Sequence, residues 1–131
     1  MSQSLFMTYC CKDKAKIPSD TMVTPSELYL SSRIQSFITV CNTKKLEWVI
    51  FSDFYGIVES HKKIHSYDKA PYEVTETDYH RLLEITIQKI LSYNTVYFYY
   101  NADSFHALYR RLVADMQKYR EVLLFDNLED I

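Results

Sequence analysis

The sequence contains a single glycine, Gly56, among its 131 residues. One glycine excludes the two common glycine-rich phosphate-binding loops and the GxSxG turn of serine hydrolases, since each motif needs at least two glycines. Gly56 is also the natural candidate for a backbone position with positive φ, which other residues adopt only at a steric cost. The sequence therefore excludes the motifs that depend on several glycines and marks Gly56 as a turn residue.

Cysteine is scarce as well, with only Cys10, Cys11 and Cys41 and no CxxC spacing. This odd-numbered set favours neither a disulfide framework nor a zinc site. His61 and His65 lie four residues apart, but their segment has no helical period, so we expect no metal site and no cofactor. The chain has no signal-peptide layout and no apolar run that could cross a bilayer. We therefore expect a cytoplasmic protein with reduced thiols.

Excess positive charge is also missing, because the formal net charge is −2. The sign changes along the chain: residues 1–75 hold nine Lys or Arg and eight Asp or Glu, whereas residues 76–131 hold six and nine. A nucleic-acid contact would therefore depend on a local patch in the first half. Apolar residues make up 47%, which suits one globular domain over residues 1–131.

The hydrophobic pattern predicts four strands, each a short apolar run. Between them it predicts three helices. The first begins at the Thr24-Pro25-Ser26-Glu27 signal and continues to Cys41, with Leu30 on its apolar face. The second begins at Thr75, and the third is capped within 101–104. The predicted strands are 4–10, 47–52, 95–100 and 121–125, and residues 57–74 are expected to form a long irregular connection.

This order predicts an α/β fold: a three-layer α/β/α sandwich around a short, mostly parallel four-stranded sheet. Parallel sheets bind ligands outside the carboxyl ends of their strands. We therefore expect a site at the segments 10–14, 52–56 and 101–104, and at Asp126. The whole prediction requires the strands 4–10 and 47–52 to run parallel.

The first segment offers Cys10 and Lys14. A cysteine beside lysines can have a lowered pKa and act as a nucleophilic thiolate, and a lysine can hold phosphate. The alternative is that Cys10 only fills the core.

The second segment offers Asp53 and Tyr55, with Tyr67 and Asp68 further along the chain. A carboxylate accepts the N–H groups of a base, and aromatic faces stack on it. The alternative is a tight turn in which the aspartate caps backbone amides. In the third segment, Asp103 or Ser104 is expected to cap a helix whose first amides can hold an anion.

Several of these residues also form a family pattern. Cys10-x3-Lys14, the LYxS run ending at Ser31, the IFSxxYG run ending at Gly56 and Ile64-x2-Tyr67-Asp68 resemble a DUF6884-type family of small bacterial and archaeal domains. The SxxYG part also resembles peroxide-stress proteins of the YaaA type, which are DNA-associated. The Cys-x3-Lys part resembles the lysine-transferring domain of archaeosine synthase, although here a long insertion separates Lys14 from Tyr29 and Ile34 replaces a histidine. These resemblances imply a uracil-DNA-glycosylase-like sandwich and work on a 7-deazaguanine base in tRNA.

Two functions remain open. The first is an enzyme that acts on a nucleobase, free or in tRNA or DNA, by transferase or N-glycosidase-like chemistry. The second is a non-catalytic binding module or assembly subunit, a homodimer for example, in which the Tyr97–Tyr100 strand pairs with another copy at a sheet edge. For the first function the candidate catalytic residues are Cys10, Lys14 and Asp53. The candidate binding residues are Ser31, Ser52, Tyr55, Gly56, Tyr67, Asp68 and Asn101.

Overall fold

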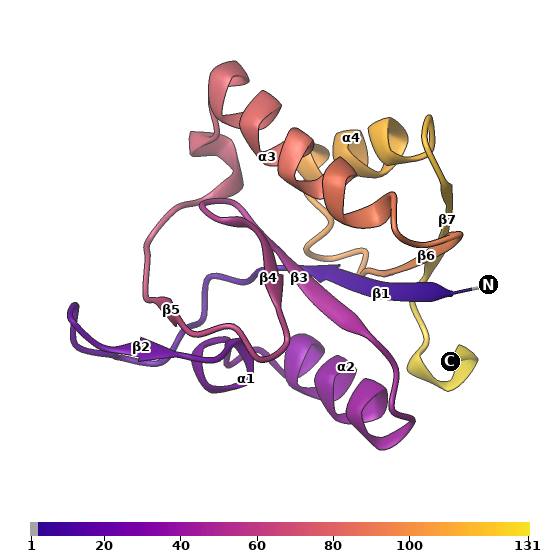
Figure 1. Ribbon diagram of the computed structural model, residues 1–131. Coiled ribbons are helices and arrows are strands. Elements are labelled where there is room, and N and C mark those ends of the chain that lie inside the picture. The colour runs from indigo at the N-terminus through magenta and orange to yellow at the C-terminus, as the bar shows by residue number, and fades with distance from the viewer. Residues whose placement is uncertain (1–2) are drawn as a thin grey trace.

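Five strands form one sheet in the order β4-β3-β1-β6-β7 in the computed structural model, which describes residues 3–131 (Figure 1). β1 pairs in parallel with β3 and with β6, and β6 pairs in parallel with β7. The parallel α/β sheet is therefore confirmed, with the four predicted strands as its parallel part. The bounds are β1 Ser4–Tyr9, β3 Trp48–Ser52, β4 Gly56–Glu59, β6 Thr95–Tyr99 and β7 Glu121–Phe125.

The fifth strand, β4, lies in the segment that we expected to be irregular. It pairs antiparallel with β3 through a tight turn at residues 53–55. The expected edge position of the Tyr97–Tyr100 strand is wrong, because β6 lies between β1 and β7. A separate two-stranded sheet joins β2 (Met22–Val23) to β5 (Ile64–His65).

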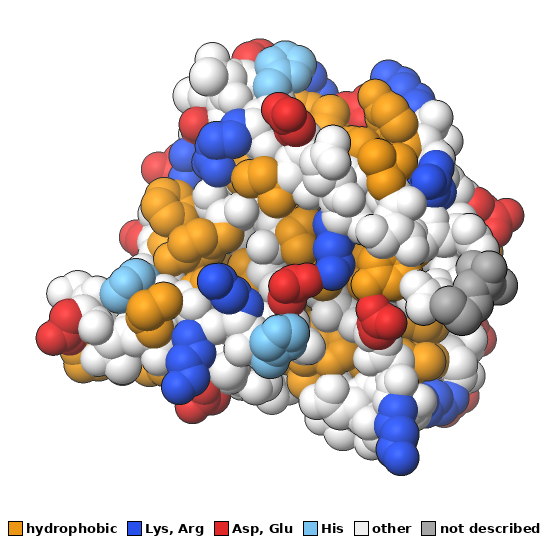
Figure 2. Space-filling model, viewed as in Figure 1, with side chains coloured by type: hydrophobic (Ala, Val, Ile, Leu, Met, Phe, Trp, Pro, Cys, Tyr) orange, Lys and Arg blue, Asp and Glu red, His pale blue; other side chains and the backbone are white. Residues whose placement is uncertain are grey.

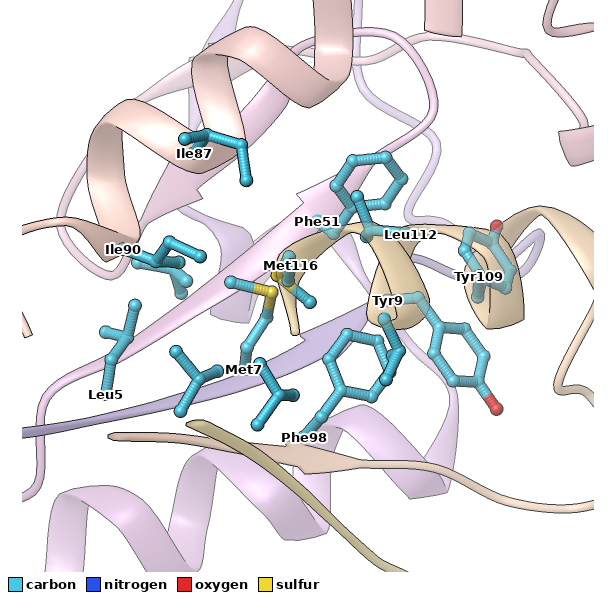
Figure 3. Close-up of a cluster of buried hydrophobic side chains, with 14 of the residues drawn as sticks. Leu5, Met7, Tyr9, Phe51, Ile87, Ile90, Phe98, Tyr109, Leu112 and Met116 are labelled. Atoms are coloured by element: carbon cyan, nitrogen blue, oxygen red, sulfur yellow. The ribbon is translucent and has the colours of Figure 1, made fainter. Parts of the chain in front are cut away.

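Helices cover both faces of the sheet (Figure 1). Side chains alternate along a strand, so Leu5, Met7 and Tyr9 of β1 pack towards α3 (Glu76–Ile90) and α4 (Ala107–Met116) (Figure 3). The other face of the sheet packs on α2 (Ser32–Thr43). No helix within residues 3–131 is long and apolar enough to cross a membrane.

The first predicted helix is interrupted. It begins as expected, with the Thr24 amide donating to Glu27 Oε1 at 3.0 Å, but α1 spans only Pro25–Leu28. Tyr29 is extended because it forms an isolated bridge with Lys14, and a second helix starts after Ser31, whose Oγ accepts from the Ile34 amide. The prediction that Leu30 lies on the buried face is therefore wrong, since its side chain is exposed.

The third helix begins later than predicted. Its N-cap is His106, whose Nδ1 accepts from the Leu108 amide at 3.0 Å. The predicted cap at Asp103 or Ser104 is wrong. Residues 101–104 form a separate turn, because the Asn101 side-chain oxygen accepts from the Asp103 amide at 3.1 Å. The first amides of α4 are thus separated from Asn101 by this turn and Phe105.

Gly56 has φ +83°, as expected for the single glycine of the sequence. A Cβ added there would lie 3.1 Å from Cγ2 of Ile85 on α3. Glycine therefore allows both the β3–β4 turn and the close approach of α3.

We predict that Gly56→Ala lowers the free energy of unfolding by about 1–3 kcal/mol, from the left-handed backbone and the close contact together. Urea denaturation measures this loss. In an Ile85→Ala background the contacts with Cγ2 and Cδ1 are removed and only the one with Cβ, at 3.2 Å, remains beside the backbone part, so the glycine change should cost less there. An unchanged free energy in both backgrounds would contradict this account.

Candidate functional site

A cleft of about 840 Å³ opens at the carboxyl ends of three neighbouring parallel strands. Cys10 follows β1, Asp53 follows β3, and Asn101 lies two residues after β6; all three line the cleft. The N-terminus of α2 and the segment 68–73 form its other walls. The sheet topology therefore gathers residues that lie 91 positions apart in the chain, as the parallel pairing required.

Asp53 lies at the base of the cleft, with only 1% of its surface exposed. Its two carboxylate oxygens lie 2.9 and 3.0 Å from the hydroxyl of Tyr109 on α4, which donates to them. Burial raises the pKa of the Asp53 carboxyl from 3.8 to about 6, despite the Tyr109 hydrogen bond and the positive charge of Lys14, which both lower it. Asp53 is therefore a carboxyl that can take up or release a proton near neutral pH.

Cys10 has a raised pKa, whereas a thiolate nucleophile needs a lowered one. Its sulfur lies 3.7 Å from the Tyr109 hydroxyl, and its side chain is buried. Burial, together with the neighbouring Asp53 charge, raises the pKa of the Cys10 thiol to about 12. The environment therefore favours the neutral thiol and the packing alternative for Cys10.

Tyr109 belongs to a stack of aromatic rings that ends at the cleft. The rings of Tyr9 and Tyr109 are stacked with centroids 4.4 Å apart, and Figure 3 shows both at one end of the buried cluster. Burial raises the pKa of the Tyr109 hydroxyl, so it stays protonated and keeps donating to Asp53. The Tyr9 hydroxyl accepts from the Asn101 amide at 3.1 Å and bonds Ser104 Oγ at 2.7 Å, which fixes the 101–104 turn.

Arg33, in the first turn of α2, is a cleft residue that sequence reasoning missed. Its guanidinium lies 3.9 Å from the centre of the Tyr9 ring and donates to Thr8 Oγ1 at 2.6 Å and to the Tyr9 carbonyl at 3.0 Å. Burial lowers the pKa of Arg33. None of the ion pairs found within residues 3–131 involves Arg33, so its charge lacks a carboxylate partner there.

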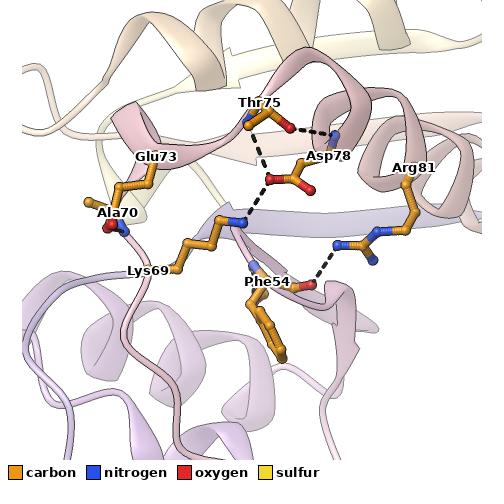
Figure 4. A network of polar contacts seen from close by, with 8 residues as sticks. Phe54, Lys69, Ala70, Glu73, Thr75, Asp78 and Arg81 are labelled. Atoms are coloured by element: carbon orange, nitrogen blue, oxygen red, sulfur yellow. Dashed lines mark hydrogen bonds and ion pairs between the residues drawn. The ribbon is translucent and has the colours of Figure 1, made fainter.

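The segment that closes the cleft is held by polar contacts (Figure 4). Lys69 Nζ lies 2.8 Å from an Asp78 oxygen at the start of α3, and the Ala70 amide donates to Glu73 Oε1 at 2.8 Å. These two contacts fix the short 3₁₀ turn Pro71–Glu73. Tyr72 of this turn lines the cleft, and 80% of its surface is exposed. An exposed aromatic ring therefore lies at the mouth of the cleft.

The structure brings together six of the ten predicted site residues. The six that line the cleft are Cys10, Lys14, Ser31, Asp53, Asp68 and Asn101.

The remaining four, Ser52, Tyr55, Gly56 and Tyr67, lie outside the cleft lining. Ser52 is buried, and its Oγ accepts from the Phe54 and Tyr55 amides, so it shapes the turn. The Tyr55 hydroxyl donates to the His65 carbonyl at 2.9 Å. Tyr67 lines an adjoining groove instead.

A comparison of the whole sequence with known families finds a match to the family described as "Family of unknown function (DUF6884)" over residues 5–124. The chain belongs to the DUF6884 family. No curated protein and no solved structure matches it. The cleft is the feature of this DUF6884 chain that bears on its function. Within residues 3–131 we find no group of three or more His, Cys, Asp or Glu side chains placed to hold a metal ion.

We predict that Asp53→Asn makes this DUF6884 domain more stable than the wild type above pH 7, with the difference vanishing below about pH 4. The folded-state pKa of about 6 exceeds the ordinary 3.8, so the unfolded chain releases this proton first and the free energy of unfolding falls as pH rises between those values. The two pKa values correspond to at most about 3 kcal/mol. Asparagine can still accept from Tyr109.

Urea denaturation at several pH values measures the difference between the two proteins. Asp13→Asn, an exposed change outside the cleft, serves as the control. A difference between wild type and Asp53→Asn that is the same at every pH would refute a raised pKa for Asp53.

Proposed function

We propose that the cleft binds a nucleotide, with the base directed towards Asp53 and the phosphate towards Arg33 and Lys14. The observation that carries this proposal is the presence, in one cavity, of a buried carboxyl and of two cations that form no ion pair among the described residues. Asp53 is the buried carboxyl, and Arg33 and Lys14 are the cations. The lining also contains the carboxylates of Asp68, Glu73 and Asp103. A nucleotide carries both matching groups, N–H donors on the base and negative oxygens on the phosphate.

The phosphate end of the cleft has three contributors. Arg33 offers a guanidinium that is already oriented by the Tyr9 ring and the Thr8 hydroxyl. Lys14 also lines the cleft, with its Nζ 4.5 Å from the centre of the Tyr67 ring. The α2 N-terminus, with Ser31 and Ser32 in the lining, adds the partial positive charge of a twelve-residue helix.

The base end suits a planar ligand with N–H groups. The ionised Asp53 accepts such hydrogen bonds, and the exposed ring of Tyr72 at the mouth offers a face for stacking. An enzyme that acts on the base would use Asp53 as its acid or base, because a carboxyl with a pKa of about 6 exchanges protons near neutral pH. Cys10 has no nucleophilic part in this proposal.

The second candidate function is an assembly subunit, and one observation favours it. β7 lies at the edge of the sheet, and its Leu123 and Leu124 side chains are 43% and 44% exposed. An exposed edge strand with apolar side chains can pair with another chain. Sedimentation equilibrium of the wild type and of Leu124→Glu tests this function: a dimer that the change disrupts supports it, and a monomeric wild type speaks against it.

We predict that isothermal titration calorimetry detects binding of nucleoside monophosphates and that Lys14→Met lowers their affinity by about tenfold. This is the typical effect of losing one charge-assisted hydrogen bond. The same change should leave the affinity for the matching nucleoside almost unaltered. Asp53→Asn should lower the affinity for both the monophosphate and the nucleoside, because both carry the base. Lys44→Met, at the opposite end of α2, is the matched control.

The panel consists of the four common ribonucleoside 5′-monophosphates and their nucleosides. If no member of it binds, or if Lys14→Met and Lys44→Met have equal effects, the nucleotide proposal is wrong.

A further inference from the structure

A second groove, of about 660 Å³, continues from the cleft. It is lined by Lys12, residues 14–18 and residues 66–68, and it shares Lys12, Lys14 and Asp68 with the cleft. A ligand whose phosphate lies beside Lys14 can therefore extend from one concavity into the other.

Three lysines, Lys12, Lys14 and Lys16, line this groove together with Ala15, Ile17 and Pro18, whereas Asp13 is absent from its lining. Lys12 lies in a bend that follows β1. From Lys14 onwards the chain runs alongside the end of α1, because Lys14 forms an antiparallel bridge with Tyr29 and the Ala15 amide donates to the Leu28 carbonyl at 2.8 Å.

The spacing of these lysines suits a chain of phosphates. Lys14 and Lys16 are two residues apart beyond the bend at Lys12, and side chains at that spacing on an extended chain are separated by about 6 to 7 Å. This spacing lets the two lysines reach successive phosphates of an extended single strand. An isolated phosphate would need only one of them, so the row indicates a ligand with more than one negative group.

The charge of the groove is largely unneutralised. No ion pair within residues 3–131 involves its three lysines, and its lining contains one carboxylate, Asp68. Further positive charge lies close by: Figure 2 shows Lys or Arg and His side chains beside β5, with acidic side chains at the outer tip of the β2–β5 sheet. This local patch lies in the half of the chain with the positive balance.

The groove also has an aromatic wall. Tyr67 lines it, but its ring is already in contact with Lys14 Nζ, 4.5 Å from the ring centre, and with the ring of Phe54, whose centroid lies 5.7 Å away. The Phe54 ring lies outside the groove lining, and 45% of its surface is exposed, so it is the ring that a base of a bound strand can reach. Lysines that follow a backbone and aromatic rings that accept bases are the two parts of single-strand binding surfaces. An acidic peptide would use the lysines but not the Phe54 ring.

We propose that this groove binds the phosphates next to the base held in the cleft, so that the ligand is a single-stranded nucleic acid segment. This inference rests on the proposed function, since the cleft must hold one base of the strand. A base can enter the cleft only when it is unstacked, which a single strand or a loop allows and a duplex resists.

The experiment compares a nucleoside monophosphate with a seven-nucleotide ribonucleotide, and with its deoxyribonucleotide equivalent, that carries the same base at its centre. Of the two oligonucleotides, the one that the wild type binds more tightly should at low salt bind roughly tenfold more tightly than the monophosphate. Lys16→Ala should remove most of this gain. It should also reduce the slope of log affinity against log salt by about 0.7, the value for one phosphate contact on a single strand.

Lys44→Ala, which removes the same charge far from the groove, is the control and should leave the slope unaltered. Because Lys16 is absent from the cleft lining, Lys16→Ala should not alter monophosphate affinity. An oligonucleotide that binds no better than the monophosphate overturns the groove proposal and leaves the cleft proposal standing.

Two further results would also count against the groove proposal. If neither ligand binds, the cleft proposal fails and the groove proposal with it. If hepta-glutamate competes as well as the oligonucleotide, or if a duplex of the same sequence binds equally tightly, the assignment to single-stranded nucleic acid is overturned.

Discussion

The parallel pairing of β1 with both β3 and β6 is the constraint on which the site depends. Tyr9 is level with Phe51 of β3, and Thr8 is level with Tyr99 of β6, so the three strands end at the same edge of the sheet. The chain leaves each strand there, and residues that follow the three strands line the cleft at this edge. This edge therefore collects the carboxyl, thiol and amide groups that would otherwise lie far apart.

Two opposite charges, the buried Asp53 and the half-buried Arg33, lie at this edge without forming a pair. Burial raises the pKa of Asp53 and lowers that of Arg33, which means that the fold disfavours the charged form of each group. The two groups do not compensate each other's desolvation, because they form no ion pair. Asp53 accepts a hydrogen bond from Tyr109, and Arg33 donates to Thr8 and to backbone carbonyls. Costs of this kind are typical of ligand sites, where the missing partner arrives with the ligand. The adjoining lysine row extends the same principle to a longer anion.

The sequence predicts the parts of this structure that follow from local patterns. Apolar runs locate the four parallel strands, and the edge rule brings Cys10, Asp53 and Asn101 together. The sequence does not predict the interruption of the first helix, because the bridge between Lys14 and Tyr29 is a contact between distant segments. That interruption is what places Arg33 in the cleft. The sequence pattern does not single out Tyr109, since helical spacing indicates burial but not the carboxylate to which its hydroxyl donates.

NMR titration of the Asp53 side-chain carboxyl carbon tests most directly whether Asp53 recognises the ligand. In the free protein the midpoint should lie near pH 6, because burial raises the pKa of this carboxyl. A bound monophosphate that donates N–H groups to the carboxylate should lower that midpoint, since such bonds favour the charged form. A midpoint near 4 in the free protein, or one that bound ligand leaves unchanged, would contradict the account.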